Sequence, residues 1–292
     1  MQDDLEIHGG EVSRRSEFFF WGFAVLALFL FLGHNALWAS EERWAEVARE
    51  MLLSGDWLHP SLNWVIYFDK PQLSYWLILP FAVLLGGMDE LVVRIPSALA
   101  GLAALYGVVS LGKTLFDKRT ALLAGWMLLS CYGFLFWSRT AAADAANSLS
   151  GLELVWRENV VRVFRAFDHK DPIYIYLYEL PRVLLPWVLL IGVGIVGLVR
   201  NWKQLPMRVR ELMVGTLLMF LLFTLSSSRR WYYILPVAPF CALLGAYGLN
   251  SAYGLAEWNR RAVWLMRILV IVAGSLGVAS LIALPLWGRF VP

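Results

Sequence analysis

Long apolar stretches alternate with short polar segments along this chain. The hydrocarbon core of a membrane is about 30 Å thick and takes roughly 20 apolar residues as a helix. Runs of suitable length cover residues 18–38, 95–112, 120–137, 178–199, 211–226, 231–248 and 263–287. The pattern therefore predicts an all-α fold, a polytopic transmembrane helix bundle with about seven spans.

The run 72–87 is apolar but short, and Pro80 interrupts it. We interpret it as a re-entrant or interfacial segment, because a full crossing there would place Lys118 and Arg119 outside. Basic residues mark the inner side of a membrane protein. Their clusters are Arg14/Arg15, Lys113/Lys118/Arg119, Arg200/Lys203/Arg208/Arg210 and Arg260/Arg261/Arg267. This alternation predicts a cytoplasmic amino terminus.

Three polar segments then face the outer side: residues 39–94, a shorter loop at 139–172, and the turn 226–232. The first of them contains an expected amphipathic helix, which we predict to lie on the membrane plane. Its apolar positions recur at helical spacing, and charged residues occupy the other face. The apolar set is Trp44, Val47, Ala48, Met51 and Leu52, and the charged set is Glu42, Glu46, Arg49 and Glu50.

Composition agrees with a membrane protein. The chain has 292 residues, of which 59% are hydrophobic and 16% charged, whereas soluble domains have about 25% charged residues. The first sixteen residues lack the features of a cleaved signal peptide, so we expect 18–37 to be a retained anchor. The net charge of +3 is small, and no nucleic-acid partner is expected. Cys131 and Cys241 lie in apolar runs without metal-ligand spacing and are predicted to be core residues.

Carboxylates and cations converge on the predicted outer face. Individually they have ordinary explanations, such as a helix cap, a surface ion pair or an interfacial anchor. Together they suit a phosphate-bearing substrate, whose oxygens Arg and Lys bind, and a carboxylate that accepts a hydroxyl proton or holds a divalent ion. The carboxylates are Glu41, Asp69 and Asp144, and the cations are Arg43, Lys70, Arg162, Arg229 and Arg230.

Collinear motifs resemble the GT-C glycosyltransferases, in particular the branch of aminoarabinose lipid A transferases and protein O-mannosyltransferase-like enzymes. In chain order the motifs are EERWAE (41–46), REM (49–51), SGDW (54–57), YFDKP (67–71), YW (75–76), RIP (94–96), LFDKR (115–119), SR-x4-D (138–144), REN-x2-R (157–162), His169 with Pro172, LPW (185–187) and SSSRRWYYILP (226–236). They extend over nearly the whole chain as a single GT-C-like transmembrane domain.

The resemblance implies an enzyme of lipid A modification or glycosylation in the bacterial inner membrane, with its active face toward the periplasm. Such enzymes move a sugar from a polyprenyl-phosphate carrier to a lipid or protein hydroxyl, so the implied partners are this donor, that acceptor and membrane lipids. The implied catalytic residues are Glu41 and Asp144. Residues implied to bind the donor phosphate are Arg43, Lys70, Arg162 and Tyr233, with further contacts from Glu46, His169, Arg229 and Arg230. A divalent metal ion, where the family has one, would lie near Asp69 and Asn159, and no other cofactor is implied.

The sequence departs from the family pattern at three points. Ser40 stands where much of the family has Asp, and Asn159 where the lipid A transferase branch has His. Between Asp144 and Glu158, where the family has several spans, only AANSLSGLELVWR intervenes, which indicates an internal deletion near residue 150.

Two other functions therefore stay open beside a reduced or inactive transferase. One is a non-catalytic protein that binds polyprenyl phosphate or assists assembly. The other, which the sequence favours least, is a transporter, because neither an internal repeat nor a mid-span acid is seen.

Overall fold

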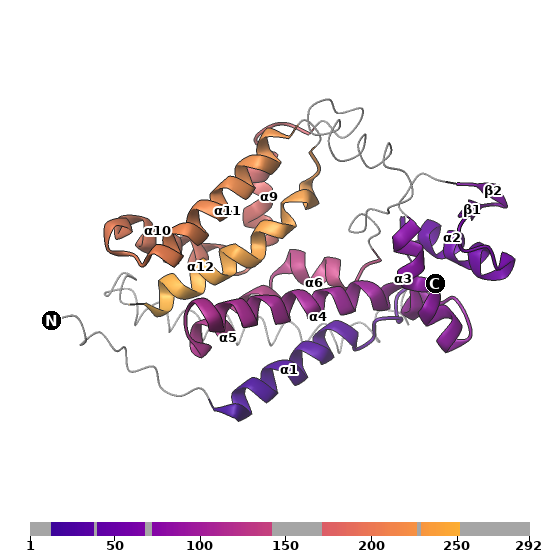
Figure 1. Cartoon of the computed structure of the whole chain (residues 1–292), viewed down its shortest axis with the longest axis horizontal. Coiled ribbons are helices and arrows are strands. Elements are labelled where there is room, and N and C mark those ends of the chain that lie inside the picture. Colours follow the sequence, from indigo (N-terminus) through magenta and orange to yellow (C-terminus); the bar gives the residue numbers. More distant parts are fainter. Residues whose placement is uncertain (1–12, 38–39, 68–71, 142–170, 227–228, 252–292) are drawn as a thin grey trace, which may run out of the picture.

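The computed structural model describes residues 13–37, 40–67, 72–141, 171–226 and 229–251. These residues are mostly helical (Figure 1). The helices are α1 (Arg14–Phe29), α2 (Ser40–Ser54), α3 (Gln72–Leu85), α4 (Glu90–Leu115), α5 (Lys118–Leu129), α6 (Tyr132–Ser138), α9 (Ile175–Val183), α10 (Val188–Arg200), η3 (Trp202–Gln204), α11 (Met207–Leu225), η4 (Trp231–Val237) and α12 (Ala238–Asn250). Two short strands, β1 (Ser61–Leu62) and β2 (Val65–Ile66), pair antiparallel as a hairpin.

Apolar helices long enough to cross a membrane confirm a multi-pass membrane protein. Within the described residues, α4 and the continuous run Trp231–Asn250 each pass this test of length and composition. Two bent pairs, α5 with α6 and α9 with α10, pass it as combined units, which gives up to four spans. The predicted total of seven stays a prediction, and the predicted span 263–287 lies outside the described residues.

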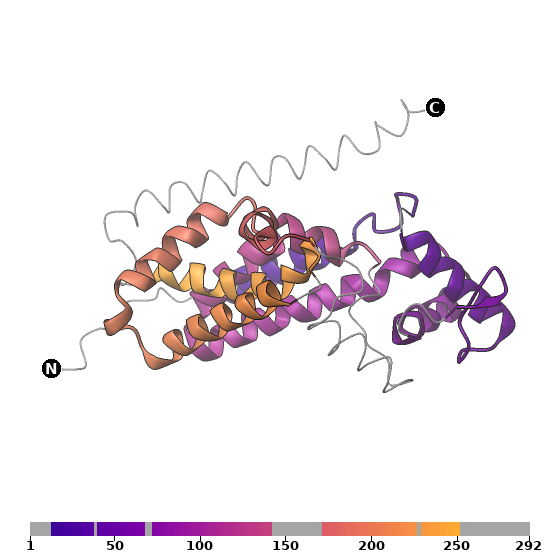
Figure 2. The ribbon, with the colours of Figure 1, turned by 90° about the horizontal axis from the view of Figure 1, so that it is seen from above.

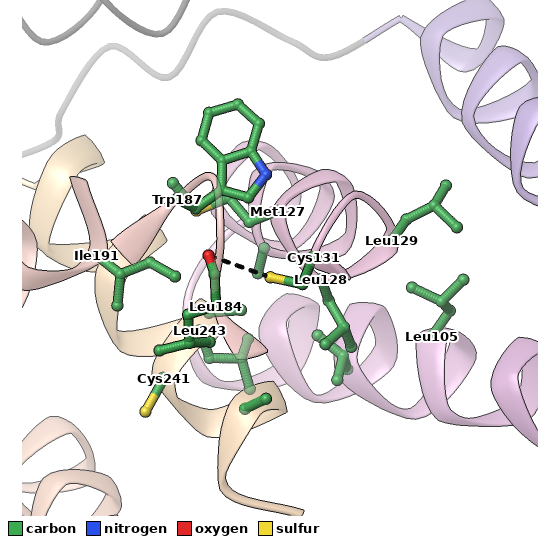
Figure 3. Close-up of a cluster of buried hydrophobic side chains, with 14 of the residues drawn as sticks. Leu105, Met127, Leu128, Leu129, Cys131, Leu184, Trp187, Ile191, Cys241 and Leu243 are labelled. Carbon is green, nitrogen blue, oxygen red and sulfur yellow. Dashed lines mark hydrogen bonds between the residues drawn. The ribbon is translucent and has the colours of Figure 1, made fainter. Parts of the chain in front are cut away.

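The predicted spans 120–137 and 178–199 are not continuous helices. The first bends by 69° between α5 and α6, and the second by 110° between α9 and α10. The two breaks face each other, so that the polar groups freed at one are bound by the other (Figure 3). Tyr132 N donates to Leu185 O at 2.9 Å, Cys131 Sγ to Leu184 O at 3.8 Å, and Trp187 Nε1 to Ser130 Oγ at 2.7 Å. Such mutual pairing is what allows non-helical backbone at membrane depth.

A continuous core joins both halves of the chain. It contains buried side chains from α1, α4, α5, α9, α10, η4 and α12, and half-buried side chains of α6 pack against it. Cys131 and Cys241 are free thiols buried in it, as predicted. Glycines allow α10 and α12 to approach closely, because a Cβ added at Gly194 would lie 2.5 Å from Gly245 O. Small residues at helix contacts are typical of membrane bundles.

The two ends of the bundle differ in chemistry. At one end, α1 begins beside the carboxyl end of α4 and the start of α5, where Glu17 forms ion pairs with Lys113 and with Lys118, the latter at 2.9 Å. At the other end lie α2, α3 and the β hairpin, and both views show them gathered there (Figures 1 and 2). The first end carries the basic residues that the sequence assigns to the inner side. The second end carries the predicted outer loop and is named the outer end after that prediction.

Helix α2 covers the predicted amphipathic segment, but its apolar face packs inside the protein. Trp44, Val47 and Met51 are buried against side chains of α3 and α4. Glu50, expected on the polar face, is instead 1% exposed and accepts hydrogen bonds from Ser61 Oγ and from Trp64 N at 3.0 Å. The hairpin supplies these donors, so a carboxylate that reads as solvated in the sequence is a structural anchor.

Candidate functional site

The centre of the outer end is a buried ion pair between Glu41, in the first turn of α2, and Arg94, near the start of α4. Arg94 Nε donates to Glu41 Oε1 at 3.0 Å and Nη2 donates to Oε2 at 2.7 Å. Their relative exposures are 5% for Arg94 and 1% for Glu41. Ala141 N also donates to Glu41 Oε1, at 2.7 Å. The pair thus joins α2, α4 and the residue that precedes the segment carrying Asp144.

Carbonyl groups at the end of α1 and in the segment after it complete this cluster. Arg94 donates to Leu32 O, Asn35 O and Ala36 O at 2.8–3.0 Å. Arg139 donates to Ala27 O and Leu30 O, at 2.5 and 2.8 Å. Ala27 lies in the last turn of α1 and Leu30 follows it, whereas Leu32, Asn35 and Ala36 lie in the segment after the helix. The last carbonyls of a helix have no partner within it and carry partial negative charge, which explains why the Arg139 guanidinium lies there. Burial and the nearby charge of Arg94 lower the pKa of Arg139.

Arg43 connects α2 to the loop that carries Asp69 and Lys70. It is exposed, and its Nη1 donates to the hydroxyl of Tyr67 at 3.2 Å. Tyr67 is the last described residue before that loop and its backbone N–H donates to Pro60 O at 2.8 Å. The predicted phosphate ligand Arg43 is therefore accessible at the outer end.

The other predicted cations lie around the start of η4. Arg229 Nε donates to Asp171 O at 2.8 Å, and its Nη1 donates to Thr224 O and Ser226 O. The half-buried Tyr233 ring stands at 89° to Tyr232, with ring centroids 5.0 Å apart. Trp137, at the end of α6, lies 4.9 Å from the Tyr232 ring. Since Arg139 follows Trp137 by two residues, η4 and the Glu41–Arg94 pair share one end of the bundle.

Two ion pairs lie at the surface of the predicted outer loop, of which Glu46–Arg49 is half-buried and Asp56–His59 is exposed. Glu46 binds Arg49, with Nη2 to Oε1 at 2.6 Å, and hydrogen bonds from this arginine lower the pKa of the Glu46 carboxyl. Asp56 accepts hydrogen bonds from the His59 ring and from the Leu58 N–H, and these bonds lower the pKa of its carboxyl, the His59 ring having the larger effect. Glu46 is therefore an ionised surface carboxylate, a poor candidate for holding a proton at neutral pH.

Six predicted site residues lie outside the described residues: Asp69, Lys70, Asp144, Asn159, Arg162 and His169. Their roles stay predictions. Hydrogen bonds fix the described residues that flank the segments carrying these six. Arg43 donates to Tyr67, Ala141 donates to Glu41, and Arg229 donates to Asp171. Within the described ranges, no group of three or more His, Cys, Asp or Glu is placed to hold a metal.

Sequence reasoning gave Arg94 and Arg139 no role, although both occur in the quoted motifs. A usable signal was present, because a charged residue at the edge of an apolar span needs a buried partner. Glu41 was predicted to be catalytic. Both of its carboxylate oxygens already accept hydrogen bonds, which favours a positioning role for this residue over proton abstraction.

Comparisons with known proteins agree with this arrangement. The family model of dolichyl-phosphate-mannose-protein mannosyltransferases matches residues 69–158. A stretch of 114 residues, 38% of this chain, is 39% identical to 21% of an undecaprenyl phosphate-alpha-4-amino-4-deoxy-L-arabinose arabinosyl transferase of Pseudomonas savastanoi pv. phaseolicola. The protein of the same name from Shewanella sediminis is 34% identical over 115 residues, 39% of this chain and 20% of that protein.

Solved structures show the same fold. ArnT from Cupriavidus metallidurans in the apo state aligns with a TM-score of 0.66 over 93% of this chain and 66% of its own. The same protein bound to undecaprenyl phosphate aligns with a TM-score of 0.68 over 89% of this chain and 64% of its own. Both are 18% identical to this chain.

The solved ArnT chains and this chain share one fold, a helical membrane domain. The sequence matches then place the chain among relatives of the aminoarabinose transferases, which confirms the predicted resemblance. The matched part spans about a fifth of the curated relatives' length, 21% and 20%, and about two thirds of the solved ArnT chains.

Proposed function

We propose that this protein binds a polyprenyl-phosphate-linked sugar at its outer end and transfers the sugar to a lipid or protein hydroxyl. The observation that carries the proposal is the fold likeness to a structure bound to undecaprenyl phosphate, which extends over 89% of this chain. The cations Arg43, Arg229 and Arg230 lie at one polar end of the described helices, and this charge supports the binding of a phosphate there. Relatives named as undecaprenyl-phosphate arabinosyl transferases support the same donor class.

The proposed reaction is a displacement at the anomeric carbon of the donor. Asp144 accepts the proton of the acceptor hydroxyl, whose oxygen forms a bond to that carbon while the carbon–oxygen bond to phosphate breaks. The electron pair leaves with the polyprenyl phosphate, and Lys70, Arg162 and Arg43 stabilise its charge. Tyr233 lines the same pocket. A divalent ion near Asp69 and Asn159 stays a prediction of the resemblance, and no step is assigned to it.

The site is proposed to face the periplasm of a bacterial inner membrane, with the amino terminus cytoplasmic. The basic clusters support this orientation, since Lys113 and Lys118 lie at the end of the bundle opposite α2.

Transfer of radiolabelled sugar from polyprenyl phosphate in membrane preparations tests the proposal. Asp144→Asn and Lys70→Ala should each lower the transfer rate by about 10²-fold or more, since each removes a group that acts in the transition state. Matched controls are Glu211→Gln and Lys203→Ala, whose side chains are exposed at the opposite end. Equal transfer by all five proteins would refute the site assignment.

A second function is favoured by one specific observation. Ser40 stands where an Asp is expected, and the adjacent Glu41 has both oxygens bound to Arg94 and Ala141. If the base has to stand at this position, a chain with Ser40 and a fully bonded Glu41 there would bind the carrier lipid without turning it over. Saturable, phosphate-dependent binding of undecaprenyl phosphate together with undetectable transfer by the wild type would favour this non-catalytic function.

A further inference from the structure

We propose that Arg94 is a positioning residue for sugar transfer, which holds the first turn of α2 and the backbone of Ala141 in a fixed relation through Glu41. Arg94 would thereby set how the outer loop 39–94 faces the segment that carries Asp144. The catalytic part of this inference rests on the proposed function. The contact itself is tested below without any substrate.

The hydrogen bonds of Arg94 leave it no capacity for another ligand. A guanidinium has five N–H groups, and Arg94 makes five hydrogen bonds: two to Glu41 and three to the carbonyls of Leu32, Asn35 and Ala36. The side chain is buried. A group so enclosed and so fully bonded acts on a reaction only through the groups it holds.

Those groups come from four separate parts of the chain. The carbonyls belong to the segment that follows α1, Glu41 belongs to α2 and Arg94 itself to α4. The third donor to Glu41 is the backbone N–H of Ala141, which follows α6. Glu41 and Arg94 are 53 residues apart, and Glu41 and Ala141 are 100 apart. One ion pair therefore fixes the relative placement of elements that the covalent chain leaves independent.

The consequence for chemistry follows from chain length. Asp144 is three residues beyond Ala141, and three extended residues reach no more than about 11 Å. A shift of Ala141 therefore moves the point from which the segment that carries Asp144 begins. Misplacing a reacting group by about 1 Å can reduce a rate by about 10²-fold. Loss of the ion pair should lower the rate of the chemical step more than it weakens donor binding.

A guanidinium is specifically required. Lysine would keep the positive charge but offers three donors from one nitrogen, too few for five acceptors arranged on different sides. Arg139 does not replace Arg94, because it donates its hydrogen bonds to the carbonyls of Ala27 and Leu30. Arg94→Lys should therefore restore only part of what Arg94→Gln removes.

Hydrogen exchange at the Ala141 amide, followed by mass spectrometry on the full chain in nanodiscs, tests the contact directly. In Arg94→Gln and in Glu41→Ala this amide should exchange at least about tenfold faster than in the wild type, because its acceptor is displaced or lost. Lys113→Gln is the matched control: it breaks an ion pair at the opposite end and should leave Ala141 unchanged. Wild-type exchange at Ala141 in both Arg94→Gln and Glu41→Ala overturns the proposal.

Steady-state kinetics with polyprenyl-phosphate sugar test the catalytic consequence. Arg94→Gln should lower kcat by about 10²-fold and change KM for the donor by less than about threefold, with Arg94→Lys intermediate. If Arg94→Gln does not fold, Arg94→Lys carries both measurements, and wild-type exchange and kcat in that variant overturn the requirement for a guanidinium. A raised KM with unchanged kcat overturns positioning in favour of donor binding. If the wild type itself transfers no sugar, the proposed function fails, while the Ala141 exchange still decides whether Arg94 positions this segment.

Discussion

A methyl group at Gly194 would test how closely α10 and α12 must approach. Gly194 faces Gly245 and Gly248 on α12, and a Cβ built on it lies 2.5 Å from Gly245 O and 3.1 Å from Gly245 Cα. Ordinary van der Waals contact begins near 3.4 Å. The obstructing atoms are backbone, which no rotamer change can move, so the helices must separate by roughly 1 Å.

The expected cost of Gly194→Ala follows from two opposing effects. Overpacking a tight contact costs about 1–3 kcal/mol. Replacing glycine by alanine within a helix returns about 0.5–1 kcal/mol, because alanine loses less backbone entropy on folding. A net loss of about 1–2 kcal/mol should lower the unfolding temperature by roughly 2–8 °C for a domain of this size.

Gly192 supplies the control on the same helix. Nothing lies within 4 Å of a Cβ built there, so Gly192→Ala should leave the unfolding temperature unchanged or raise it slightly. Intrinsic tryptophan fluorescence during heating in detergent measures both variants against the wild type. Equal unfolding temperatures for Gly194→Ala and Gly192→Ala would refute the close approach of α10 and α12.

Three further predictions concern single contacts. Removing the carboxylate in Glu50→Ala should speed proteolysis of the β hairpin, whose donors lose their acceptor; exposed Glu42→Ala is the control, and equal cleavage of the two would contradict the anchor role. Trp187→Phe removes the N–H donor at the paired helix breaks and should cost about 1–3 kcal/mol in unfolding free energy. Thermal unfolding measures this cost, with exposed Trp202→Phe as the control. A larger loss of stability in Trp202→Phe than in Trp187→Phe would contradict the prediction. Hydrogen bonds from two lysines lower the pKa of Glu17 below 4.5, so its contribution to stability is present above that value and lost as pH falls through the lower folded pKa. The difference in unfolding temperature between wild type and Glu17→Gln should therefore shrink on acidification below pH 4.5, and a difference that stays constant would disprove this coupling.

Several elements of the fold could be predicted because their cause is local. Helix α4 and the run through α12 are long and apolar, which hydropathy detects directly. The 14-residue helix α3, with Pro80 inside it, fits the predicted short segment, since about 20 residues are needed for a full span. The breaks at Ser130 and around Leu185 could not be read in the same way. Their composition is as apolar as that of the flanking helices, and only the facing break supplies their hydrogen-bond partners.

The candidate site could also be predicted only in part. The charged groups of the outer segments and their family resemblance are visible in the motifs, and the comparisons confirm that resemblance. The sequence did not show which of these charged groups are buried. Glu50 reads as part of a solvated face until the hairpin donors, 11 and 14 residues away, fold over it. Glu41 reads as an accessible acid until Arg94 binds it from 53 residues away.

The sequence alone determined that this protein is a helical membrane protein with a polar face, which it predicts to be the outer one, and a glycosyltransferase-like set of motifs. These properties depend on residue type and on periodicity, both of which are local. The tertiary structure alone decided which residues of that face hold others in place: Arg94 and Glu41 at the centre, Arg139 at the end of α1, and Arg229 beside Asp171. The physical reason is that a buried charge needs a specific partner, and those partners come from distant parts of the chain that only the packed bundle brings into contact.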